Sequence, residues 1–87
     1  MAASKPKAYK LVLVKWEDHA SSTEWKTPEE VSRSECGIFL TVGWLVHEDR
    51  KTIKVCQCIE DGGTGLVGNE SIILKKCIVS RHELELT

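Results

Sequence analysis

The fold is decided by an apolar stretch near the N-terminus, Tyr9-Lys-Leu-Val-Leu-Val-Lys-Trp16. Branched and aromatic residues fill this stretch, as is typical of a β-strand. In such a strand Leu11 and Leu13 share one face, while the two valines and Trp16 share the other. Because both faces are apolar, we expect a central strand or one that is covered on both sides.

Two later stretches indicate a hairpin. These are Gly37-Ile-Phe-Leu-Thr-Val-Gly-Trp-Leu-Val46 and the alternating Thr52-Ile-Lys-Val-Cys-Gln-Cys-Ile59, which are joined by a polar turn at 47–51. Gly43 inside the first stretch predicts a bulge or a close backbone approach. Trp44, in the middle of the same stretch, is expected in the core.

A short helix is predicted to begin at Thr27-Pro-Glu-Glu30, because Thr27 can cap it and Glu30 can complete a capping box. Further sheet elements are expected at 71–75 and 77–79, with a short strand or frayed tail at 83–86. Together these elements predict a mainly β fold, a small antiparallel barrel or rolled sheet of the Sm-like or SH3-like class. A helix packed on a flat antiparallel sheet is the alternative.

The composition limits both size and partners. With 87 residues and a net charge of −1, we expect a flexible basic N-terminal arm at 1–8 and a single domain at 9–87. Because the chain has no overall positive charge, nucleic acid is not an expected partner. No apolar run is long enough for a membrane span or a secretory signal, so a cytoplasmic location is expected. A domain this small cannot wall a large cleft alone, so copies of a homo-oligomer would share a ligand pocket.

The sequence predicts neither an enzyme nor a metal site, and no cofactor. Free buried thiols are favoured for the four cysteines at 36, 56, 58 and 77, over a zinc site or two disulfides. Cys58 is expected to lie beside Cys56 as a second small apolar side chain. Ser21 and Ser22 lie near His19 and Asp18, but neighbours within one loop seldom form a catalytic triad.

The candidate ligand-binding residues centre on two of the three tryptophans. Trp16, Asp18, Ser22 and Trp25 combine flat faces with hydrogen-bonding groups, which suits a nucleobase or a peptide. Trp25 could instead cover the core beneath its loop. The glycine-rich stretch at 61–68, in particular Gly63 and Thr64, would supply backbone amides to the ligand. The alternative is that this stretch is a mobile connection between two strands. Lys15 and Arg81 would face phosphate.

Three segments resemble a family of small phage and prophage proteins. They are Val14-Lys-Trp-Glu-Asp18 with a serine and Trp25 after it, Thr41-Val-Gly-Trp-Leu-Val-His-Glu-Asp49, and Ile72-Ile-Leu-Lys-Lys-Cys-Ile78 followed by Glu83-Leu84. The resemblance covers about residues 10–84 and contains no catalytic motif. Leu74 stands where that family often has a proline.

Non-enzymatic proteins of this kind often act against host defence, so the resemblance implies a function of that type in the cytoplasm of an infected bacterium. The expectation is a homo-oligomer that sequesters a small nucleotide signal. The alternatives are an inhibitor that binds and blocks a host defence protein, and a single-stranded nucleic-acid-binding module.

Overall fold

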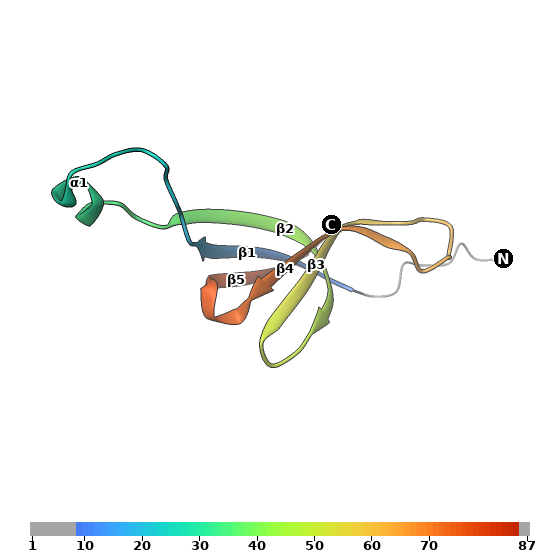
Figure 1. Cartoon of the computed structure of the whole chain (residues 1–87). Helices are drawn as coiled ribbons and strands as arrows, with labels where there is room; N and C mark the ends of the chain where they lie inside the picture. The colour runs from blue at the N-terminus through green and yellow to red at the C-terminus, as the bar shows by residue number, and fades with distance from the viewer. Residues whose placement is uncertain (1–8, 86–87) are drawn as a thin grey trace.

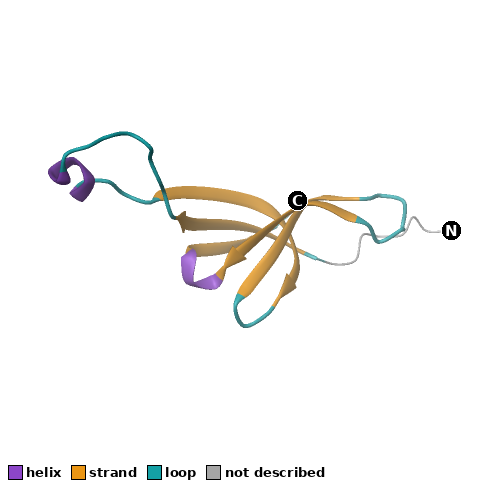
Figure 2. Ribbon diagram, viewed as in Figure 1, coloured by secondary structure: helices purple, strands orange, loops and turns teal. Residues whose placement is uncertain are grey.

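The computed structural model describes residues 9–85, so the predicted N-terminal arm at 1–8 lies outside the described residues. Five antiparallel strands form one sheet in the order β4-β3-β2-β1-β5 (Figure 1, Figure 2). The elements are β1 (Lys10–Asp18), α1 (Pro28–Ser32), β2 (Gly37–Glu48), β3 (Thr52–Ile59), β4 (Val67–Leu74), the 3-10 turn η1 (Lys75–Cys77) and β5 (Ile78–Leu84). The mainly β fold and the hairpin at β2–β3 are confirmed.

Strand β1 is central, as its two apolar faces predict. It pairs with β2 on one side and with β5 on the other. Val12 and Val14 are buried, and Trp16 packs against the same core from the same face. Leu11 and Leu13 lie on the opposite face of the sheet, because successive side chains of a strand alternate.

One small core lies on the inner face of the sheet. It comprises Val12, Val14, Ile53, Val55 and Ile73, with Trp16, Leu45 and Ile78 packed against it. Val14, Ile53 and Val55 have no exposed surface although residues 9–85 form no second sheet to cover them, so the one sheet curls around these residues. Within residues 9–85, β4 and β5 do not pair, so the sheet stays open and closure into a barrel is not shown.

Gly43 makes the close approach that the sequence predicts. A Cβ atom on Gly43 would lie 2.5 Å from Cγ1 of Val55 and 2.8 Å from the backbone oxygen of Cys56. Val55 therefore occupies the space that any side chain at position 43 would need. Since Gly43 also pairs with Val12 on β1, the glycine lets side chains from β1 and β3 meet above the backbone of β2.

Three expectations about buried groups are wrong. Trp44 pairs with Leu11 and Cys56 and does not belong to the core cluster, because it lies on the outer face of β2. Of the four cysteines only Cys56 is buried, and burial raises the pKa of its thiol. Cys58 is on the same face but exposed, since β4 opposes it with Gly68 and leaves it uncovered. The alternative of a helix packed on the sheet fails too, because α1 has no buried residue.

The turn between β2 and β3 is held by Asp49. Its Oδ1 atom accepts hydrogen bonds from the backbone N–H groups of Lys51 at 2.9 Å and Thr52 at 2.8 Å. These bonds, the one from Thr52 first, lower the pKa of Asp49 from 3.8 to about 2. In the part of the chain that the structure describes, no helix is long and apolar enough to cross a membrane.

Replacing Gly43 with alanine is expected to destabilise the fold by about 1–3 kcal/mol, because the new methyl group collides with Val55 and with the backbone of Cys56. Urea unfolding measures the change. Gly68→Ala is the matched control, since its methyl group meets only Cβ of Cys58, at 4.0 Å. Equal stabilities of the two variants would contradict a close approach at Gly43.

Asp49 is expected to make stability depend on pH in the acid range. The pKa of its carboxyl is lower in the folded chain, so its contribution is complete above the unfolded value near 3.8 and is lost as pH falls towards 2. Asp49→Asn should therefore lose stability at neutral pH and change less than the wild type between pH 4 and pH 2. Urea midpoints at several pH values test this, with Asp61→Asn as a control that should follow the wild type.

Candidate functional site

The most distinctive feature of the molecule is the segment between β1 and β2, residues 19–36, which we call the finger. It extends away from the sheet and carries α1 near its tip (Figure 1). The radius of gyration of the chain is 17.5 Å. A compact domain of this length has a radius of gyration of about 12 Å. The finger is therefore a projection and not a lid over the core.

Local hydrogen bonds shape the tip of the finger. The Thr27 Oγ1 atom accepts a hydrogen bond from the Glu30 N–H at 3.2 Å, and Glu30 Oε1 accepts one from the Thr27 N–H at 3.2 Å. With Pro28 in the first turn, this is the capping box that the sequence predicts, which is confirmed. Arg33 ends the helix and pairs with Glu29 one turn earlier. The finger therefore has an ordered tip that does not depend on packing against the sheet.

Trp25 is the most exposed large hydrophobic side chain of the described residues. Its relative exposure is 101%, so the expectation that it covers the core is wrong. Val31 of α1 is also exposed. Exposed apolar side chains on an ordered projection are typical of an interaction site, and tryptophan is the residue most enriched among the energetic anchors of interfaces.

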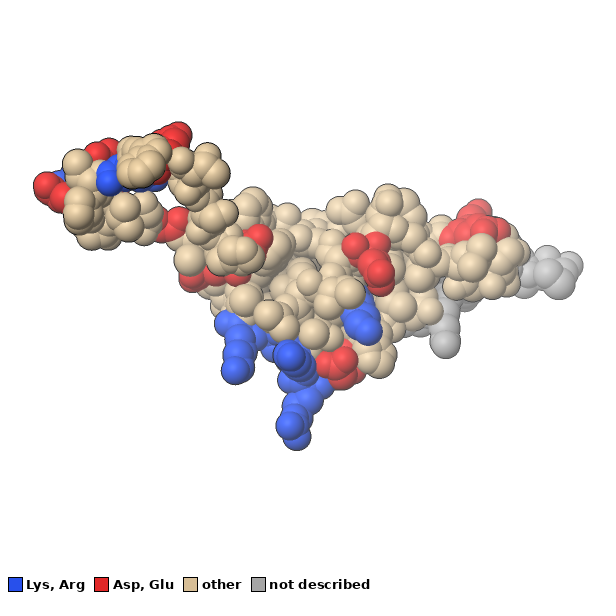
Figure 3. All heavy atoms as spheres, viewed as in Figure 1, with Lys and Arg blue, Asp and Glu red and all other residues tan. Residues whose placement is uncertain are grey.

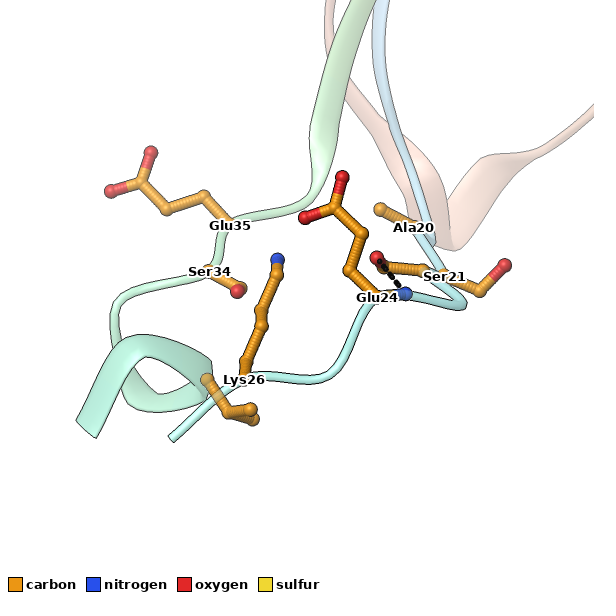
Figure 4. A pocket seen from close by; sticks show the side chains of 8 residues that line it. Ala20, Ser21, Glu24, Lys26, Ser34 and Glu35 are labelled. Atoms are coloured by element: carbon orange, nitrogen blue, oxygen red, sulfur yellow. Dashed lines mark hydrogen bonds between the residues drawn. The ribbon is translucent and has the colours of Figure 1, made fainter. Parts of the chain in front are cut away.

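A hollow of about 500 Å³ lies within the finger (Figure 4). Its walls include the hydroxyl groups of three serines and three ionisable side chains, namely Ser21, Ser22, Ser34, Glu24, Lys26 and Glu35. In Figure 4 the Lys26 side chain points into the hollow between Glu24 and Glu35. Ser22 uses its Oγ atom to accept a hydrogen bond from the Glu24 N–H at 3.1 Å. Two carboxylates and one ammonium group give this hollow a negative charge.

Trp16 lies away from the finger hollow. Its indole Nε1 atom donates a hydrogen bond to Thr41 Oγ1 at 3.0 Å, and its ring centroid lies 5.3 Å from that of Phe39. Both neighbours come from β2, and the indole packs against the core. Trp16 is thus already engaged within the chain, and it does not form one surface with Trp25.

The two basic residues of the predicted site also lie apart from it. Lys15 is on the outer face, opposite to Trp16, because the two are adjacent in one strand. Arg81 donates to Glu48 at 3.1 Å, and Lys75 contacts the same carboxylate at 2.8 Å. The bonds from Lys75 and then Arg81 lower the pKa of Glu48. The sequence did not point to Glu48, because no local pattern links it to Lys75 and Arg81, which lie far along the chain.

The remaining predicted residues lie at the base of the finger or at the other end of the sheet. Asp18 is the last residue of β1, and its Oδ1 atom lies 3.3 Å from Nδ1 of His19. Gly63 and Thr64 belong to the β3–β4 connection, on the opposite side of the molecule from the finger (Figure 1). Thr64 accepts a hydrogen bond from the Leu66 N–H at 3.2 Å. The eight residues predicted to bind a ligand therefore do not form one site within a single copy of the chain. Only Ser22 and Trp25 lie together on the finger, with Asp18 at its base.

A second hollow, of about 460 Å³, lies at the base of the finger and includes Asp18, His19, Cys36 and Cys77 in its lining. These residues offer chemically suitable metal ligands. Nevertheless, no group of three or more His, Cys, Asp or Glu residues within 9–85 is arranged so that it could hold a metal ion.

Charge is unevenly distributed over the molecule. The finger holds four glutamates against one lysine and one arginine. On the face shown in Figure 3, acidic side chains lie over the finger, while Lys and Arg side chains gather below the sheet. The β2–β3 turn contains Arg50 and Lys51, and η1 contains Lys75 and Lys76. The finger is thus suited to a basic partner surface.

The chain matches no protein-family model, no curated protein and no solved structure.

Replacing Thr27 with alanine is expected to loosen the tip of the finger without weakening the sheet. The variant keeps its backbone N–H but loses both hydrogen bonds of the Thr27 Oγ1 atom, the one it accepts from the Glu30 N–H and the one it donates to Glu30 Oε1, a change that costs a helix about 1 kcal/mol. Hydrogen exchange should therefore become faster at 28–34, while the urea midpoint of the sheet stays unchanged. Thr23→Ala, a change of the same kind elsewhere on the finger, should leave exchange at 28–34 unaltered. A parallel loss of sheet stability would contradict the independence of the finger.

Proposed function

We propose that this chain is a non-enzymatic protein-binding module that recognises a basic surface of its partner through the finger. The observation that carries the proposal is the fully exposed Trp25 on a projection whose own hydrogen bonds order its tip. A preformed tip loses little conformational freedom on binding, which favours affinity. The acidic excess of the finger supplies electrostatic complementarity to a basic partner and speeds the encounter.

A protein partner suits this geometry better than a nucleotide does. Trp16 and Trp25 do not face a common space, and Arg81 is held by Glu48. The finger hollow carries two carboxylates, which repel phosphate groups. An exposed tryptophan on a projection with an excess of acidic residues instead resembles the apolar anchor and polar rim of a protein interface.

Sequestration of a small nucleotide in a homo-oligomer is the second candidate. The observation in its favour is the finger hollow, because about 500 Å³ lies within the range of small-molecule sites and three serine hydroxyls line it. In this candidate, other copies of the chain would have to supply the cationic groups that face phosphate. Lys15, Arg81, Gly63 and Thr64 would then act from neighbouring subunits.

The biological setting is part of the proposal. The resemblance to small phage proteins supports a host defence protein as the partner, in the cytoplasm of an infected bacterium. An Sm-like or SH3-like barrel is likewise proposed, and five antiparallel strands around one small core support it.

Removing the Trp25 side chain is the direct test. A photoreactive amino acid at position 25 should cross-link to one discrete protein in infected, defence-active cells. With that protein purified, Trp25→Ala should raise the dissociation constant by about 30-fold or more, the loss expected of an interface anchor. Isothermal titration calorimetry measures it, and binding should weaken as salt is added.

Leu66→Ala is the matched control, because Leu66 is an exposed apolar side chain on the β3–β4 connection, far from the finger. It should bind like the wild type. Native mass spectrometry of the same preparation separates the two candidates. A discrete extra mass of nucleotide size, together with no cross-linked protein, would replace the protein-binding proposal with the nucleotide candidate.

A further inference from the structure

The outer face of β1 and β2 is a largely apolar surface whose side chains are exposed or only partly buried within residues 9–85. We call it the β1–β2 outer face, and cross-strand pairing assigns its side chains because paired residues share a face. Its rows are Leu11 with Trp44, Leu13 with Val42, Lys15 with Leu40, and Glu17 with Ile38. Ile38, Leu40 and Val42 expose 50%, 66% and 46% of their surface.

The surface area of the chain is compatible with an interface of ordinary size. The chain exposes 7236 Å². Size scaling for a compact monomer of this mass gives about 5,200 Å², so the excess is about 2,000 Å². A stable dimer buries about 800 Å² on each partner. An interface of this size is smaller than the excess, to which the projecting finger also contributes.

The charges on this face complement themselves. Lys15 and Glu17 are exposed, lie two residues apart on one strand, and point to the same side. Neither has an ion-pair partner among residues 9–85. Consider a two-fold axis that lies in the interface, at right angles to β1 and level with residue 16. It places Lys15 of one copy opposite Glu17 of the other, twice, because a two-fold interface uses the same patch on both subunits.

The same operation places Leu40 of one copy opposite Ile38 of the other, since these residues pair with Lys15 and Glu17 on the neighbouring strand. Apolar side chains thus meet apolar ones, and each charge meets its opposite. A different protein would need to supply this pattern independently, whereas a second copy supplies it by symmetry. The self-complementary pattern therefore singles out a second copy of the chain as the occupant.

We propose that two copies of this chain form a two-fold dimer through the β1–β2 outer face, with Leu40 packed against Ile38 and Lys15 paired with Glu17 across the interface. This proposal does not depend on the function assigned to the finger, because it rests on the register of β1 and β2 and on the charges of Lys15 and Glu17. In this dimer the two β1 strands overlap around residue 16, so the outer face of β1 is covered at Lys15 and Glu17.

Sedimentation velocity over a concentration series tests the dimer. The wild type should approach twice the 9.8 kDa mass of the chain. Leu40→Asp should raise the dimer dissociation constant by about tenfold or more, since it places a carboxylate against the apolar Ile38 side chain of the other copy. Leu66→Asp is the matched control, because Leu66 has almost the same exposure, 63%, and lies outside this face. A wild type that stays monomeric, or equal dissociation constants for the two variants, would overturn the proposal.

A charge exchange tests the two-fold arrangement itself. Lys15→Glu places carboxylates opposite each other and should weaken the dimer by about tenfold or more. Adding Glu17→Lys reverses both charges and should restore a dissociation constant within about threefold of the wild type, because each opposite-charge pair is formed again. Circular dichroism shows that each variant is folded. A folded double variant that dimerises no better than Lys15→Glu would overturn the proposed arrangement.

Discussion

The architecture depends on the contact between Val55 and the backbone of β2 at Gly43. With no side chain there, β3 approaches β2 closely enough for its valine to lie where a Cβ would be. Val12, the partner of Gly43 on β1, completes the contact from the other side. Through this crossing a single curled sheet buries five apolar side chains without a second layer. A bulkier residue at position 43 would force the strands apart and admit water to the core.

A core this small divides the chain into two parts. The sheet is held by long-range pairing and by the crossing at Gly43, whereas the tip of the finger is held by its own capping box. Among the described residues, hydrophobic side chains that the core does not accommodate lie on the finger, on the β1–β2 outer face, and on β4, β5 and the β3–β4 connection. Surfaces of this kind are where proteins meet partners.

Patterns confined to one segment were predictable from the sequence. The alternation in β1, the hairpin β2–β3, the cap at Thr27 and the close approach at Gly43 depend on neighbouring residues or on the chemistry of one residue. Contacts between distant segments were not predictable. Trp44 and Trp25 were interpreted from residue type, but the register of β1 and β2 places the former on the outer face, and the projection of the finger exposes the latter. The convergence of Lys75 and Arg81 on Glu48 depends on how the sheet curls.

The independence of the finger has an evolutionary consequence. Selection on most proteins couples recognition to folding, because a mutation that improves binding often disturbs the core. Here no residue of α1 is buried, so substitutions on the tip escape that conflict. Sequence changes at the tip can therefore accumulate while the sheet keeps its stability. The tip is thus a segment whose sequence can vary while the sheet that carries it stays the same.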